Sequence, residues 1–168
     1  MNTSEAIRAR RSIRKFKSGA EIPKKDIEMM LEAAMMAPSA MNSRPWAFVV
    51  VETQAKRVEI ARVHPHAQMV IDASIAIVVC GKLDTLGEGM PEFWPQDCGA
   101  AIENILLQAV ELGYGAVWCG VYPNKGRVES IRQVVGTEAV PVAVIAVGIS
   151  DEQPNARGFY DSKKVKYV

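Results

Sequence analysis

Two short apolar runs constrain the fold of this 168-residue chain more than any other feature of its sequence. "SIAIVVCG" (74–81) and "AVPVAVIAVGI" (139–149) are rich in β-branched residues and carry no charge. Both are well short of the roughly 20 residues that a membrane-spanning helix needs, so we expect no membrane helix. Runs of this length and composition are typical of strands buried on both faces, which need further layers of structure above and below them.

Helical patterns alternate with strand patterns along the rest of the chain. The longest, "QDCGAAIENILLQAVELG" (96–113), has its apolar residues on one face and ends at Gly113. A short helix is predicted to begin at an N-cap formed by Thr3 or Ser4. Further helices are predicted at 24–37, 54–63 and 124–136, and further strands at 46–52 and 114–123. With 49% hydrophobic residues, the chain can form one packed core, and we expect a single layered domain over residues 1–168, of the α/β or α+β class.

Two segments have no regular period. Residues 82–96 combine turn-forming glycines and prolines with two aromatic residues, which indicates a surface loop or lid. The stretch from Asp151 to the end is polar and has no core of its own, so we expect it to lie on another surface. The charged start of the chain does not resemble a signal peptide, and we expect a cytoplasmic protein.

Side chains that commonly perform catalysis are scarce. The only two histidines, His64 and His66, stand in "VHPHA" without a further ligand at metal-binding spacing, so we interpret them as polar surface and expect no metal site. The cysteines, Cys80, Cys98 and Cys119, have apolar neighbours and no CxxC spacing, which favours buried free thiols. Neither a dinucleotide-binding GxGxxG motif nor a Walker loop is present.

The segment "RARRSIRKFK" (8–17) places six cations in ten positions, although the net charge of the whole chain is only +1. If the segment is helical, Arg10 and Arg14 project from one face with the Ser12 hydroxyl between them, and such a group suits a phosphate monoester. Two other interpretations stay open. One is a solvated basic face, and the other is a nucleic-acid-binding stripe, which the lack of interleaved aromatic residues disfavours.

Four segments together resemble the FMN-dependent nitroreductase family, specifically its short single-domain members. They are "RRSIRKF", "APSAMNSRPWAFVVV", "ENILLQAVELGYGAVWCGVYP" and the ending "ARGFYDSKKVKYV". The resemblance implies an α+β, three-layer fold in which helices flank a central mixed, mainly antiparallel sheet. It also implies a homodimer with two FMN molecules at the subunit interface, small-molecule electron acceptors, and no nucleic-acid or membrane partner.

The resemblance also assigns site residues by position. Arg10 and Ser12 are similar to phosphate and ribityl contacts, with Arg11 beside them, and Arg157 resembles a second phosphate arginine. Arg14 resembles the cation that faces the pyrimidine edge of the flavin, an edge that Gln68 is also expected to reach. The segment Pro38, Ser39, Ala40, Met41 and Asn42 resembles the part that the other subunit supplies against the flavin. Trp118, Cys119, Gly120 and Val121 resemble the strand end whose backbone lies against the isoalloxazine ring.

The implied activity is the NAD(P)H-dependent reduction of nitroaromatics, quinones or similar acceptors in a ping-pong cycle, with the chemistry on FMN rather than on a protein acid or base. Two alternatives stay open: a flavin-modifying or dehalogenating member of the superfamily, and a non-catalytic FMN-binding or storage protein. One departure from the family pattern is Arg44, which stands where glutamine is frequent. In residues 82–96, Met90, Phe93 and Trp94 could cover the flavin ring or pack against the partner subunit.

Overall fold

The computed structural model describes residues 1–86 and 92–168, so the predicted role of Met90 lies outside the described residues. The core is a four-stranded sheet in the order β1-β2-β4-β3. Its strands are β1 (Trp46–Val51), β2 (Ile75–Gly81), β3 (Gly115–Gly120) and β4 (Val140–Gly148). The three strand pairs are all antiparallel, and a parallel bridge between Ser12 and Ala116 adds the N-terminal segment beside β3.

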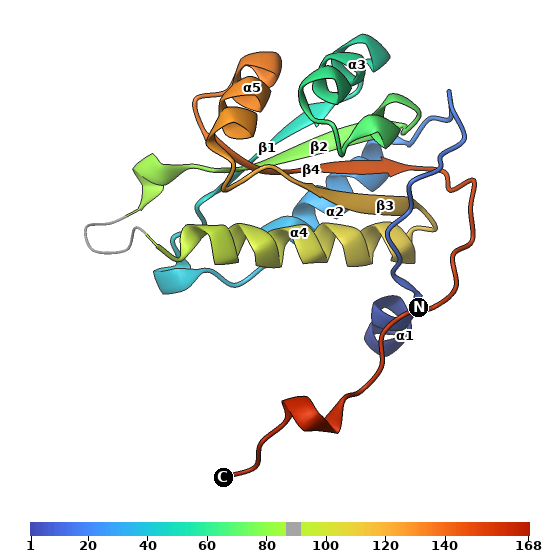
Figure 1. Ribbon diagram of the computed structural model, residues 1–168, viewed down its shortest axis with the longest axis vertical. Coiled ribbons are helices and arrows are strands. Elements are labelled where there is room, and N and C mark those ends of the chain that lie inside the picture. The colour runs from blue at the N-terminus through green and yellow to red at the C-terminus, as the bar shows by residue number, and fades with distance from the viewer. Residues whose placement is uncertain (87–91) are drawn as a thin grey trace.

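Helices cover both faces of this sheet, which gives the three layers expected of the α+β fold. Figure 1 shows α3 and α5 on one face and α2 and α4 on the other, with α1 at the lower end of the body. The helices are α1 (Thr3–Ala9), α2 (Lys24–Met35), α3 (Gln54–Val63), α4 (Trp94–Glu111) and α5 (Lys125–Val135). Short 3₁₀ segments lie at Ala40–Asn42, Gln68–Ile71, Leu83–Thr85 and Ser162–Lys164.

The sheet separates two apolar clusters, as the charge-free runs predicted. Every residue of β2 is buried, because alternate side chains point into the two layers. Met30 of α2 and Ile102 of α4 are fully buried on one side, and Ile60 of α3 and Ile131 of α5 are fully buried on the other. Burying one such side chain contributes about 1.5–3 kcal/mol to the stability of the fold. The helices on both faces therefore stabilise the central strands.

The first helix differs from its prediction at both ends. Its N-cap is Asn2, whose side chain accepts from the Glu5 amide while the Glu5 carboxylate accepts from the Asn2 amide, so the predicted cap at Thr3 or Ser4 was wrong. The helix ends at Ala9, before the basic segment is complete. The chain is then extended, because the Ile13 amide donates to the Ala116 carbonyl at 3.0 Å. A helical face shared by Arg10 and Arg14 is therefore not formed.

The longest helix begins two residues earlier than predicted. Trp94 starts α4, is only 6% exposed, and packs on Gly81 and edge-on against Tyr122. It is part of this subunit's core rather than a free cover for a ligand. Gly113 follows the helix with φ of +85°, a conformation that glycine adopts without strain, and it ends α4 as its position in the sequence predicted.

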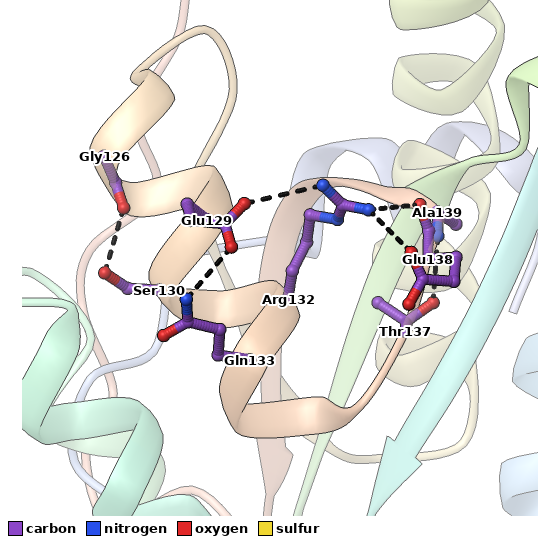
Figure 2. A network of polar contacts seen from close by, with 8 residues as sticks. All are labelled: Gly126, Glu129, Ser130, Arg132, Gln133, Thr137, Glu138 and Ala139. Carbon is purple, nitrogen blue, oxygen red and sulfur yellow. Dashed lines mark hydrogen bonds and ion pairs between the residues drawn. The ribbon is translucent and has the colours of Figure 1, made fainter.

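A polar network fixes the turn between α5 and β4 (Figure 2). The Arg132 guanidinium donates to the Glu138 carbonyl at 2.9 Å and to its carboxylate at 3.1 Å. Arg132 also pairs with Glu129, whose other carboxylate oxygen accepts from Gln133. Exposed ion pairs contribute little stability, so we assign this network mainly to holding α5 at one angle over the sheet.

The C-terminal tail runs away from the body, past α1 (Figure 1). Its first part is held, because the Glu152 carboxylate accepts from the backbone amides of Arg14 and Lys15. Further along, Phe159 and Tyr167 are 86% and 87% exposed. The tail thus exposes aromatic side chains that its own subunit does not cover.

Candidate functional site

A groove of about 590 Å³ opens beside the end of β3. Its walls come from Arg14 of the N-terminal segment, residues 64–69 after α3, residues 117–120 of β3, and Arg127 in the first turn of α5. Arg14, Gln68, Trp118, Cys119 and Gly120, all predicted from the sequence, therefore meet in one place. His64, His66 and Arg127 join them without having been predicted.

The floor of the groove is the outer edge of β3, which is the last strand of the sheet. The Ala116 carbonyl points outward, where Ile13 donates to it, and the Val121 amide points inward to the Val142 carbonyl of β4. Backbone groups alternate in direction along a strand, so Trp118 and Gly120 direct theirs outward like Ala116. A ligand in the groove thus meets backbone donors of an edge strand, and a side chain built on Gly120 would meet no atom within 4 Å.

The outward carbonyl of Gly120 accepts two hydrogen bonds. His64 Nε2 lies 3.0 Å from it and Arg127 Nη1 lies 2.7 Å from it. The His66 amide donates to His64 Nδ1 at 3.3 Å, so the geometry fits a neutral His64 ring that carries its proton on Nε2. His64 is fully buried, which lowers its pKa, and the nearby Arg127 charge lowers it further. The expectation that both histidines form polar surface is therefore wrong for His64.

Sulfur-containing and amide side chains, those of Cys119, Met69 and Gln68, also line the groove. The Cys119 thiol lies 3.7 Å from the Met69 sulfur and is 5% exposed. Burial raises the pKa of this thiol to about 11, although the Arg14 charge acts in the opposite direction. Gln68 uses its amide nitrogen to donate to the Ala61 carbonyl at 2.7 Å. Cys119 is thus a neutral thiol that lines the groove, and all three cysteines are free and buried, as predicted.

The other predicted residues of the basic segment precede Arg14 on the same extended stretch but do not line the groove, and Arg11 lines a separate hollow of about 290 Å³ that Glu152 also lines. Arg10 pairs with Glu103 of α4 at 3.2 Å, and Ser12 forms the bridge to Ala116. The Nε atom of Arg11 is buried and has no acceptor among the described residues. This stretch therefore offers guanidinium donors whose capacity the described part of the chain does not use up.

The remaining predicted residues lie outside the groove of their own subunit. Pro38 to Asn42 form an exposed turn in which Met41 is 84% exposed and the Ala40 amide donates to Asp97 at 3.1 Å. Arg157 lies on the exposed tail, and Val121 is buried with its amide bonded to β4. Arg44 is exposed and donates through Nε to the Asn42 side chain.

The described part of the chain contains no candidate metal-binding site. Residues 1–86 and 92–168 contain no group of three or more His, Cys, Asp or Glu side chains that could hold a metal ion. Within the same residues, no helix is both long and apolar enough to cross a membrane. A second hollow, of about 520 Å³, lies near Arg57, but that guanidinium already donates to the carbonyls of Val70 and Glu52.

Comparison with known proteins identifies the family of this chain. The model of the nitroreductase family matches residues 7–76 and 63–149, which include most of the chain and the groove. The chain belongs to the nitroreductase family. A Methanothermobacter thermautotrophicus protein named "Putative NADH dehydrogenase/NAD(P)H nitroreductase" is 45% identical over 98% of this chain and 86% of its own length.

Solved structures agree with this assignment. The crystal structure of a Bacteroides thetaiotaomicron protein that is also named "Putative NADH dehydrogenase/NAD(P)H nitroreductase" has a TM-score of 0.90 and 36% sequence identity. The match covers 99% of this chain and 98% of that chain. An FMN-dependent nitroreductase of Clostridium difficile is 28% identical with a TM-score of 0.88, over 98% of both chains. This nitroreductase is therefore an oxidoreductase with the fold that its sequence predicted.

Proposed function

We propose that this nitroreductase is a homodimeric, FMN-dependent oxidoreductase that uses NADH or NADPH to reduce small acceptors such as nitroaromatics and quinones. The observation that carries the proposal is the outward edge of β3 at Trp118 and Gly120, placed beside the Arg14 guanidinium in one groove. The FMN-dependent relative with the same fold supports the choice of cofactor. Residues 1–168 act as one domain in this proposal.

The residues of the groove suit FMN by their donor chemistry. The pyrimidine part of a flavin carries carbonyl oxygens and ring nitrogens, and backbone amides of an edge strand can donate to such acceptors without titrating. Gly120 leaves its face of the groove open for a flat ring. Arg10 and Arg11 lie outside the lining of the groove, and we assign them, with Arg157, to the phosphate, which accepts several charge-assisted hydrogen bonds.

FMN, when bound, supplies a hydride acceptor and donor, which supports a ping-pong cycle between NAD(P)H and the second substrate. The protein's contribution is then electrostatic and geometric. Arg14 holds a permanent positive charge at the groove, and such a charge stabilises the negative charge that a flavin gains on reduction. The backbone of Trp118 and Gly120 fixes the plane in which the ring lies. Cys119 forms an apolar wall that excludes water.

The dimer completes the site in this proposal. The turn from Pro38 to Asn42 does not line the groove of its own subunit and exposes Met41, and we propose that it covers the groove of the partner. The exposed aromatic residues of the tail also need a surface to cover them, and a second copy of this chain supplies one. Closed two-fold pairing is the commonest arrangement of homo-oligomers. Three buried free thiols suit the reducing cytoplasm, where we place the protein.

The phosphate part of the proposal is tested by removing its arginines. We expect Arg10→Ala combined with Arg157→Ala to release FMN during gel filtration, because both substitutions remove charge-assisted contacts to the phosphate. The double variant Arg8→Ala with Lys163→Ala removes two exposed cations outside the groove and should keep the cofactor. If the first double variant elutes with as much FMN as the wild type, the phosphate assignment is wrong.

A further inference from the structure

The Gly120 carbonyl is the point where the two unpredicted groove residues act together. His64 follows α3 and lies 56 residues before Gly120 in the sequence, whereas Arg127 belongs to α5 and lies 7 residues after it. A carbonyl at the end of an edge strand would ordinarily be bonded to water. Here one fully buried imidazole and one guanidinium occupy its acceptor sites, and both side chains line the groove.

We infer that His64 and Arg127 are positioning residues that hold the Gly120 carbonyl in one orientation at the groove and offset its partial charge, and thereby set how tightly the groove binds FMN and how readily the bound flavin is reduced. This inference rests on the proposed function. Because Trp118 and Gly120 face outward, their backbone must stay in one orientation for the neighbouring amides to meet a ring. Two donors, one directly after α3 and one in α5, fix that orientation more firmly than the sheet alone, since the only strand paired with β3 is β4 and the outer edge of β3 is bridged at Ala116 alone among the described residues.

The electrostatic effect of the two donors has a definite sign. A carbonyl oxygen carries partial negative charge, and next to a flavin it disfavours the extra negative charge of the reduced ring. Hydrogen bonds from His64 and Arg127 offset that partial charge, and Arg127 adds a full positive charge. Loss of either donor should therefore make the bound flavin harder to reduce. The buried and neutral state of His64 means that it acts as a donor and contributes no charge of its own near neutral pH.

Matched variants separate donation from mere packing. His64→Leu introduces an apolar side chain of similar size that cannot donate to the carbonyl. His64→Gln introduces an amide that can still donate. Arg127→Met keeps an unbranched apolar stem but removes the guanidinium, and with it the hydrogen-bond donors and the positive charge. Lys125→Met removes a charge from the same turn of α5 at an exposed position outside the groove and serves as the control.

Two quantities are measured on each variant: the FMN dissociation constant, by quenching of flavin fluorescence, and the midpoint potential of the bound flavin. We expect His64→Leu and Arg127→Met each to weaken FMN binding at least tenfold. We also expect each to shift the two-electron equilibrium toward oxidised flavin about tenfold, which is about 30 mV for a two-electron couple. His64→Gln and Lys125→Met should stay within threefold of the wild type in both quantities.

The possible outcomes distinguish this inference from the proposed function. If the wild type binds FMN but His64→Leu and Arg127→Met match it in both quantities, the inference is wrong and the proposed function stands. The inference is equally wrong if these variants only lower the thermal stability of the FMN-free protein. If His64→Leu binds FMN too weakly for its potential to be measured, the comparison of dissociation constants decides. Weak binding by His64→Leu together with near-wild-type binding by His64→Gln supports the inference, and equally weak binding by both variants contradicts it. A wild type that binds no FMN overturns both.

Discussion

Replacing Gly81 with alanine probes the packing that places the start of α4 against the sheet. A Cβ atom on Gly81 would lie 2.6 Å from Cζ3 of Trp94 and closer still to Cε3. The ring cannot move freely, because it is only 6% exposed and also packs edge-on against the Tyr122 ring. Overpacking of this kind costs about 1–3 kcal/mol, and the smaller entropy of the unfolded alanine chain returns about 0.4–1 kcal/mol. The middle values of these two ranges predict that Gly81→Ala lowers the free energy of unfolding by about 1.3 kcal/mol, and the extremes allow at most about 2.6 kcal/mol.

The assay is urea unfolding followed by far-ultraviolet circular dichroism, at one fixed protein concentration because subunit association would alter the midpoint. Gly126→Ala is the matched control, since its Cβ would meet only the Asn124 side chain at 3.6 Å. It should be neutral or stabilising by up to about 1 kcal/mol. Combining Gly81→Ala with Trp94→Leu should cost about 1 kcal/mol less than the sum of the two single changes. Strict additivity, or a neutral Gly81→Ala, would refute the steric argument.

Two further predictions concern titrating groups. Because burial lowers the pKa of His64 below its ordinary value of 6.5, the unfolded chain takes up this proton before the folded chain does. The free energy of unfolding should thus be greatest above about pH 6.5 and fall as the pH drops through that value, because a charged His64 would face the Arg127 charge and the His66 amide. The measurement is the urea midpoint as a function of pH, and His64→Gln should show a smaller fall than the wild type. The native thiols should react with a thiol reagent at pH 8 much more slowly than in urea, because burial raises their pKa values to about 12, 12 and 11. A native rate equal to the rate in urea would contradict the burial of Cys80, Cys98 and Cys119.

Local sequence patterns predicted most of the helices and strands, because the residues that end each helix or strand stand next to its apolar pattern. The apolar runs became β2 and β4, and Gly113 ends α4 as predicted. The basic segment was harder, because its helical spacing competes with a long-range bond. The Ile13 amide pairs with Ala116 more than 100 residues away, and this pairing keeps the segment extended. Sequence periodicity does not record such a partner.

The groove shows the same division. Arg14, Gln68 and Gly120 were found by their resemblance to family motifs, and the structure brings them together. His64 and Arg127 were missed, because a histidine in a loop and an arginine in a charged helix both look like surface residues. Their shared contact with one carbonyl depends on how α3 and α5 pack over β3. A feature that could have indicated it is the pair of cations, Lys125 and Arg127, in the first turn of α5, where a helix dipole disfavours positive charge.

The most direct test of the central proposal is an anaerobic titration of the purified protein, saturated with FMN, with NADH and with NADPH. We expect a yellow protein whose flavin absorbance is bleached by at least one of the two reductants and returns when a nitroaromatic or a quinone is added. A protein that retains no FMN at all would contradict the assignment of the groove. A yellow protein that neither reductant bleaches would contradict the proposed NAD(P)H-dependent catalysis and indicate a flavin-binding protein without this turnover.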